Sequence, residues 1–185
     1  YIRYAQMMSG APQALWRDSQ ARAYVRWLAY AVLSVTAWRV WTTGEPLEPV
    51  FRESLFNLTS IMSSSGFFTG SFPTWGGFML VVAFVIGIVG GCSGSSGAGL
   101  TVFRVQLVLA AVRREVRRIV NPSSVEPIRY DGRTVGEDVL NALILFVSGY
   151  ILILGVMSVA MTLLGVDSFS ALFAVWTAIG NFGYG

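Results

Sequence analysis

Residues 139–166 form a run of 28 residues without a formally charged side chain. A helix of about 20 apolar residues crosses the hydrocarbon core of a bilayer, because each residue adds about 1.5 Å. The composition agrees: 54% of the 185 residues are hydrophobic and 12% are charged, about half the charged fraction of a soluble domain. We therefore expect an all-α integral membrane protein in which this run is the clearest transmembrane span.

Two further apolar stretches are long enough to be spans. Residues 24–41 carry Arg26 and Arg39 near their two ends, where we expect the long side chains to reach the membrane surfaces. Residues 75–112 are interrupted at 90–99 by five glycines and three serines. Each glycine costs a helix about 1 kcal/mol relative to alanine, so we expect the second span to be broken there.

The arginines indicate which ends of the spans face the cytoplasm. The chain has no lysine, and most of its thirteen arginines lie in the flank 1–23 and the linker 113–136. Positive residues mark the cytoplasmic side, so both segments are expected there, and the acidic loops at 44–53 and around Asp167 are expected outside. A nucleic-acid patch is the alternative, but the basic segments adjoin apolar runs. We expect contact with membrane lipids and no nucleic acid.

Several enzyme chemistries lack their side chains in this sequence. There is no histidine, and Cys92 is the single cysteine, which excludes an internal disulfide, a multi-cysteine metal site and Ser-His-Asp catalysis from this chain. A membrane enzyme that uses carboxylates would need ionisable groups inside its spans, and 139–166 has none. We expect neither an enzyme nor a covalently bound cofactor.

Residues 50–74 start and finish on the outer side if three spans alternate in direction. The segment TSIMSSSGFFTGS within them is too polar for an ordinary span, although 50–62 could form a helix of about three turns. A short helix that enters the membrane and returns as irregular backbone is a re-entrant loop, which persists only where protein or water covers it. An extracellular surface loop is the alternative.

A second copy of this pattern lies 117 positions further along the chain. SLFNLTSIMSSSGF at 54–67 aligns with ALFAVWTAIGNFGY at 171–184, and Gly66 then meets Gly183. Each copy follows an apolar span and an acidic loop. The chain is therefore expected to hold one and a half units of span, pore helix, loop and span, the second unit stopping after its loop.

Loops of this kind can direct successive backbone carbonyl oxygens at a dehydrated cation, replacing its water shell. Glycine adopts the backbone angles that such a turn requires, and the helices that end at the loops point their partially negative C termini at the ion path. We therefore predict a cation filter. Its residues are Ser63, Ser64, Ser65, Gly66, Phe67, Gly180, Asn181, Phe182, Gly183, Tyr184 and Gly185.

Three motifs in order resemble the Trk/Ktr/HKT superfamily of potassium transporters, specifically its bacterial TrkH type. SIMSSSGF resembles the third filter loop of that family, and IGNFGYG resembles the fourth, with Tyr184 where proline is usual. GGCSGSSGAGLTVFR is similar to a stretch of the third M2 helix, with Arg104 kept and Thr101 where lysine is usual. The resemblance implies M1–pore helix–filter loop–M2 repeats as in potassium channels. Residues 24–112 would be the third repeat and 137–185 a truncated fourth.

In that family the segment matching 90–99 is an intramembrane loop that obstructs the pore below the filter and moves during gating. A nucleotide-binding loop and a face for close helix packing are the alternatives. For Arg104, contact with lipid headgroups and contact with the pore, the loop or a regulatory partner both remain open. The gating loop implied by the resemblance consists of Gly90, Gly91, Cys92, Ser93, Gly94, Ser95, Ser96, Gly97, Ala98 and Gly99.

The resemblance implies potassium uptake across the bacterial inner membrane, with K⁺ as the transported ion and the filter loops facing the periplasm. It also implies a homodimer of the full-length chain and a cytosolic nucleotide-binding regulatory ring, similar to TrkA, as partner. A secondary cation carrier with broken helices around a mid-membrane site is the alternative, because it also predicts interrupted spans.

Overall fold

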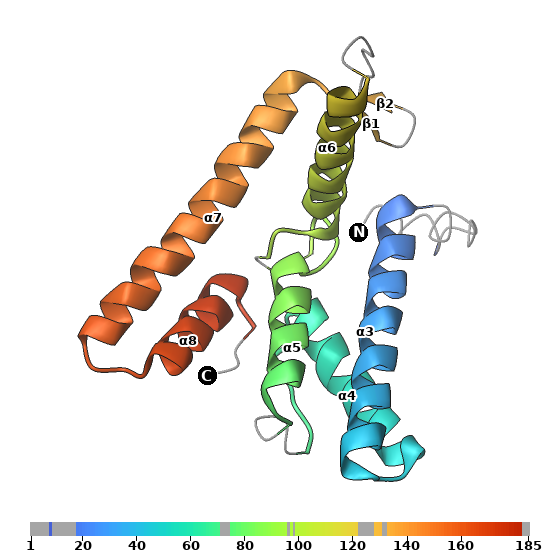
Figure 1. The fold of residues 1–185 in the computed structure, drawn as a ribbon, viewed down its shortest axis with the longest axis vertical. Helices are drawn as coiled ribbons and strands as arrows, with labels where there is room; N and C mark the ends of the chain where they lie inside the picture. Colours follow the sequence, from blue (N-terminus) through green and yellow to red (C-terminus); the bar gives the residue numbers. More distant parts are fainter. Residues whose placement is uncertain are drawn as a thin grey trace.

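The computed structural model describes residues 8, 18–70, 75–95, 97, 99–121, 128–130 and 133–182. Apart from one short hairpin, the regular structure of these residues is helical (Figure 1). The elements are α3 (Ser19–Thr43), α4 (Leu47–Ser63), α5 (Gly77–Val89), α6 (Val102–Val120), β1 (Arg129–Tyr130), β2 (Arg133–Thr134), α7 (Glu137–Leu163) and α8 (Ser168–Gly180). The expectation of a helical chain is confirmed, and the hairpin is an addition that the sequence did not indicate.

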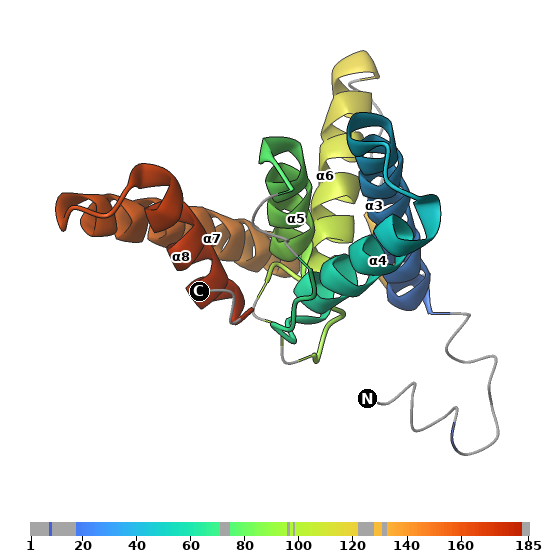
Figure 2. The same ribbon diagram turned by 90° about the horizontal axis from the view of Figure 1, so that it is seen from below.

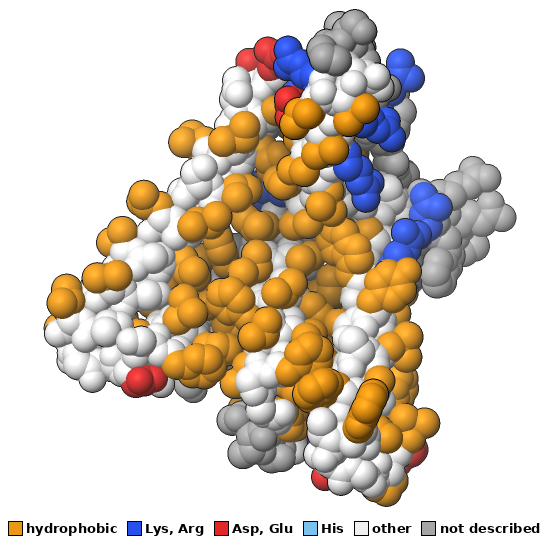
Figure 3. All heavy atoms as spheres, viewed as in Figure 1, with side chains coloured by type: hydrophobic (Ala, Val, Ile, Leu, Met, Phe, Trp, Pro, Cys, Tyr) orange, Lys and Arg blue, Asp and Glu red, His pale blue; other side chains and the backbone are white. Residues whose placement is uncertain are grey.

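Helix α7 covers most of the uncharged run. Among the described helices, it alone is long and apolar enough to cross a membrane by length and composition. Ile144, Val156 and Met157 lie on different sides of α7 and are 62%, 60% and 53% exposed. Hydrophobic side chains line it from end to end (Figure 3). A helix that is apolar all round needs surroundings other than water.

The first predicted span lies within α3, whose 25 residues extend for about 37 Å. The Asp18 carboxylate begins the helix by accepting the backbone N–H groups of Gln20 and Ala21, at 2.8 and 3.2 Å, and Gly44 ends it in the left-handed conformation at φ 68°. The chain then folds back at once, since α4 begins at Leu47.

The early start of α4 corrects one prediction. The acidic loop expected at 44–53 is wrong in extent, because Glu53 lies on α4 rather than in a loop. The same start also determines the surroundings of Arg39, which the sequence placed near a membrane surface. Its guanidinium is buried and donates to Glu53 Oε2 at 2.9 Å and Glu45 Oε2 at 3.3 Å, and it lies over the Trp75 ring at 4.2 Å. Because α4 covers the end of α3, Arg39 finds partners inside the chain.

The predicted interruption of the second apolar stretch is confirmed. Helix α5 ends at Val89 and α6 begins at Val102. Helix α6 continues to Val120, so the first residues of the expected linker are helical. The hairpin follows, with Arg129 paired to Thr134. Arginine side chains gather where α3 begins and α6 ends (Figure 3).

The main hydrophobic core joins α3, α4, α5 and α8 through buried side chains such as Val35, Leu58 and Ala83. The largest side chain that the second half of the chain contributes to this core is Trp176 of α8. A Cβ atom at Gly87 would come within 2.2 Å of the Trp176 ring, so the absence of a side chain at Gly87 lets α8 pack closely on α5. The C-terminal ends of α4 and α8 turn toward one region, where the α5–α6 connection also lies (Figure 2).

Candidate ion filter and intramembrane loop

The first candidate filter loop begins where α4 ends. Ser64 adopts the left-handed conformation at φ 57° and ψ 35°. Its backbone N–H donates to the carbonyl of Ile61 at 3.1 Å, and the N–H of Ser65 donates to the carbonyl of Ser60 at 3.0 Å. This pair of bonds is the Schellman arrangement that closes a helix and turns the chain sharply. Gly66 follows with φ 75°, as expected for a glycine that redirects the backbone.

The second loop begins in the same way at the end of α8. Asn181 is left-handed at φ 55° and ψ 39°. Its N–H donates to the carbonyl of Ala178 at 3.3 Å, and the N–H of Phe182 donates to that of Thr177 at 3.0 Å. Each of these bonds has its counterpart in the first loop 117 positions earlier. The internal repeat found in the sequence is therefore a repeat of backbone geometry.

The side chains of the predicted filter residues differ in their surroundings. Phe67 is 71% exposed, whereas Phe182 is 1% exposed and packs on Trp176, with 5.0 Å between ring centroids. Gly180 allows this packing, since a Cβ there would come within 2.0 Å of the Phe182 ring. Phe182 can therefore contribute only backbone to a filter. Three further predicted residues lie outside the described residues: Gly183, Tyr184 and Gly185.

Serine hydroxyls brace the first loop against α4. Ser65 Oγ lies 3.0 Å from Ser60 Oγ, and Ser63 Oγ donates to Ser65 Oγ and to the Ser60 carbonyl, both at 3.2 Å. A cavity of about 360 Å³ opens beside these hydroxyls. Its lining residues are Arg52, Leu55, Phe56, Thr59, Ser60, Ser63, Ser65 and Phe67.

The returning leg of the first loop is held by Asn57, a residue that the sequence analysis missed. Its side-chain amide exchanges two hydrogen bonds with the backbone of Thr69, at 2.9 and 3.0 Å. The available signal was a lone asparagine on the apolar face of a predicted pore helix, where a polar side chain needs partners.

The predicted gating loop leaves α5 and returns to it. The N–H of Leu100 donates to the carbonyl of Ile88 at 2.9 Å, and that of Val102 donates to the carbonyl of Gly91 at 3.0 Å. A Cβ atom on Gly99 would lie 3.1 Å from the Gly90 Cα atom, so glycine permits the two ends to meet. Loops with adjoining ends form compact units. Ser96 and Ala98 lie outside the described residues.

The predicted gating loop contacts the end of α4 directly. A Cβ atom on Gly97 would lie 2.6 Å from Ser64 Oγ, and one on Gly91 would lie 3.8 Å from the Met62 carbonyl oxygen. Ser64 Oγ is buried and has no hydrogen-bond partner among the described residues. The first candidate filter loop and the predicted gating loop, which were predicted from separate parts of the sequence, are therefore neighbours.

Ser93 of the same loop contacts the start of α3. The Ser93 N–H donates to the side chain of Gln20 at 3.0 Å, and Cys92 is half-buried.

Thr101, the last residue before α6, has φ 67° and ψ 144°, a conformation that a β-branched residue adopts only under strain. Arg104 lies over the ring of Phe146 on α7 at 3.9 Å. Among the described residues, this contact joins Arg104 to α7.

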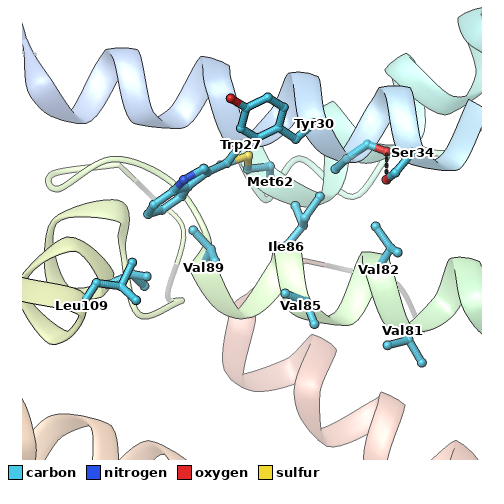
Figure 4. A pocket seen from close by; sticks show the side chains of 12 residues that line it. Trp27, Tyr30, Ser34, Met62, Val81, Val82, Val85, Ile86, Val89 and Leu109 are labelled. Carbon is cyan, nitrogen blue, oxygen red and sulfur yellow. Dashed lines mark hydrogen bonds between the residues drawn. The ribbon is translucent and has the colours of Figure 1, made fainter. Parts of the chain in front are cut away.

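A cavity of about 560 Å³ lies between α3, α5 and α6 and reaches Met62 near the end of α4 (Figure 4). Its walls are mainly aliphatic and aromatic, and the hydroxyl of Ser34 donates to the carbonyl of Ala31 at 2.9 Å. Such walls suit hydrocarbon and offer little to a cation. The lining residues are Trp27, Tyr30, Ala31, Ser34, Met62, Val81, Val82, Val85, Ile86, Val89, Val105 and Leu109.

Solved and curated proteins resemble this chain closely. The crystal structure of the potassium transporter TrkH from Vibrio parahaemolyticus matches with a TM-score of 0.91 at 29% identity, over 98% of this chain and 40% of that one. The potassium uptake protein TrkI of Halomonas elongata is 29% identical, over 100% of this chain and 37% of its own length. TrkH of Escherichia coli (strain K12) is 30% identical, over 100% of this chain and 39% of its own length.

The chain therefore spans about two fifths of the proteins that it matches. The relatives are named transporters, which identifies the chain as part of a membrane protein. The model of the TrkH family, described as cation transport protein, matches residues 46–185, which is most of the sequence. The chain belongs to the TrkH family of cation transport proteins.

Proposed function

We propose that the protein to which this chain belongs takes up potassium across the bacterial inner membrane through a pore, and that this chain supplies two of its filter loops. The relatives are named potassium uptake proteins, and potassium is the cation that backbone-carbonyl filters bind after removal of its water. Four loops are needed to surround such an ion, so the remaining two would come from parts of the protein outside this chain.

The observation that carries this proposal is the shared geometry of the two helix ends. Ser64 and Asn181 turn the chain identically after α4 and α8. Each helix then points its partially negative C terminus toward the start of its loop. A pore with quasi-symmetric filter loops requires this repetition, whereas two unrelated surface loops do not.

The intramembrane loop is proposed as the gate of this pore. It touches the end of α4 at Ser64 and Met62, which would place it directly below the filter. Its glycines allow the close approach of Gly90 and Gly99 without making regular structure, so the loop can change its path at low conformational cost. A gate made of a helix could not change its path without breaking backbone hydrogen bonds.

The arginine-rich ends of α3 and α6 are proposed to face the cytoplasm, with the two filter loops facing the periplasm. The full-length protein is proposed to form a homodimer, to contact anionic lipid through these arginines, and to meet a cytosolic nucleotide-binding regulatory ring at the same end. The contact of Arg104 with Phe146 gives no support to a direct role for Arg104 in the gate.

The test is flux of Rb⁺ and Na⁺ into liposomes that contain the full-length protein. Gly66→Ser should lower the ratio of Rb⁺ to Na⁺ uptake, because a side chain at φ 75° distorts the carbonyl ring. Gly44→Ser is the matched control, since Gly44 also has positive φ, at 68°, but ends α3 far from the loop along the chain. An unchanged ratio in Gly66→Ser would refute a filter at this loop.

A further inference from the structure

The side chain of Asn57 is buried completely and uses both ends of its amide. Its Nδ2 donates to the backbone carbonyl of Glu53 at 3.0 Å and to that of Thr69 at 2.9 Å. Its Oδ1 accepts the backbone N–H of Thr69 at 3.0 Å. A carboxamide has two donors and an acceptor, so the side chain pairs with Thr69 as a neighbouring β-strand would.

A second connection holds the other end of the same loop. The backbone N–H of Ser65 donates to the carbonyl of Ser60 at 3.0 Å. Asn57 and Ser60 lie three positions apart, on one face of α4. The loop between Ser65 and Thr69 is therefore attached at both ends to a single helix, and Gly66 and the residues that follow it have little freedom to change the direction of their carbonyl groups.

The attachment continues outward to α3. A Cβ atom on Gly70 would come within 2.2 Å of Glu53 Oε1, so the residue after Thr69 lies against the Glu53 carboxylate. That carboxylate accepts a hydrogen bond from buried Arg39 at 2.9 Å. The returning leg of the loop is thus supported by α4 directly and by α3 through Glu53.

Comparison of the two repeats separates this role from that of ending the helix. The position equivalent to Asn57 in α8 is Ala174. Helix α8 nevertheless ends with the same hydrogen bonds at Asn181 and Phe182 as α4 does at Ser64 and Ser65. The amide is therefore not needed to form or close a pore helix. Asn57 binds instead the returning leg of the first loop, after the helix has ended.

We infer that Asn57 is a positioning residue for ion selectivity. By pairing with the backbone N–H and carbonyl of Thr69, its side-chain amide fixes the direction of the carbonyl groups of Gly66 and Phe67. This inference rests on the proposed function, because it assumes that these carbonyl groups bind the ion. An apolar side chain at position 57 would fill the same space without the cost of burying an amide. The amide is explained by the direction that it gives to the loop.

The test uses the full-length protein in liposomes, with the ratio of Rb⁺ to Na⁺ uptake as readout. The ratio counts only functional pores, so loss of folded protein lowers both fluxes together and leaves it unchanged. Asn57→Ala should lower the ratio by about tenfold, the effect expected when a buried hydrogen-bond pair is lost from the filter support. Ser54→Ala is the matched control: Ser54 is fully buried on the same helix, and its hydroxyl has no partner among the described residues.

Asn57→Asp provides a second readout that packing alone would not change. A protonated aspartic acid can accept from the Thr69 N–H and donate to the Thr69 carbonyl, whereas the carboxylate turns a second oxygen toward two carbonyl groups. The ratio should therefore recover as the pH falls in Asn57→Asp and stay constant in Asn57→Ala. The neighbouring charged groups, Glu53, Glu45 and Arg39, are the same in both variants.

Failure of this inference can be distinguished from failure of the proposed function. If Gly66→Ser lowers the ratio but neither Asn57 variant does, the loop is a filter that does not depend on Asn57, and the inference is wrong. If Gly66→Ser also leaves the ratio unchanged, the filter itself is wrongly placed. Should Asn57→Ala not fold, a pH-independent ratio in Asn57→Asp equal to that of the unaltered protein overturns the inference.

Discussion

Ser64 and Asn181, which lie 117 positions apart, share one backbone conformation, with φ of 57° and 55°. Neither is glycine, although the left-handed conformation that ends a helix favours glycine. Asparagine tolerates this conformation well and serine less so. Strain of this kind persists where the surrounding structure determines the path of the chain, and both positions lie where an ion filter would begin.

The contact between the first candidate filter loop and the proposed gating loop can be tested by a double-mutant cycle. Gly97→Ala should destabilise the full-length protein by about 1 kcal/mol, because its Cβ meets Ser64 Oγ. Adding Ser64→Ala removes that oxygen without relieving the positive φ at position 64, and should restore most of the loss when the free energy of unfolding is measured in detergent.

The control for this cycle is Gly91→Ala, whose Cβ would meet Ser95 Oγ at 2.5 Å instead. Ser64→Ala should not rescue it. Strictly additive effects of Gly97→Ala and Ser64→Ala would contradict the contact between the loops.

Strain at Thr101 leads to a prediction of increased stability. A residue held in a sparsely populated region costs about 1–3 kcal/mol, and glycine relieves this cost while adding about 0.5–1 kcal/mol of unfolded-chain entropy. Thr101→Gly should therefore stabilise the protein by about 1 kcal/mol in denaturant titration. Thr162→Gly, at an exposed helical position of α7, should have the opposite sign. A loss of stability in Thr101→Gly would show that Thr101 is not strained.

The buried ion pair at the end of α3 should matter more than the exposed pair beside it. The side chains of Arg39 and Glu53 are 9% and 32% exposed, whereas those of Arg52 and Glu48 are 79% and 71% exposed. Arg39→Gln should cost about 2 kcal/mol, because it leaves a partly buried carboxylate unpaired. Arg52→Gln should change stability by about 0–1 kcal/mol. Equal effects on the free energy of unfolding would contradict the burial of Arg39.

The elements that the sequence predicted correctly are those with a long periodic or compositional signal. The uncharged run predicted α7, the glycines of 90–99 predicted the break between α5 and α6, and the offset of 117 predicted two equivalent helix ends. Each of these signals is local or repeats along the chain, so it can be found without knowing how the helices pack.

The features that were missed depend on contacts between distant residues. The sequence places Arg39 near the end of a span, where an arginine side chain commonly reaches a membrane surface. In the structure, α4 folds back over this end and brings Glu53 to Arg39. Asn57 finds its partner twelve positions away in a loop without periodicity. The hairpin at Arg129–Thr134 has only two residues in each strand, too few for an alternating pattern. In each case tertiary packing, and not local preference, decides the structure.

The most direct test of the account is the location of Rb⁺ in crystals of the full-length protein, by anomalous diffraction. The account predicts Rb⁺ on the pore axis, coordinated by carbonyl oxygens from 63–67 and from 180–185. Rb⁺ bound elsewhere, with both loops facing protein or solvent and no ion between them, would contradict the assignment of these loops as a potassium filter.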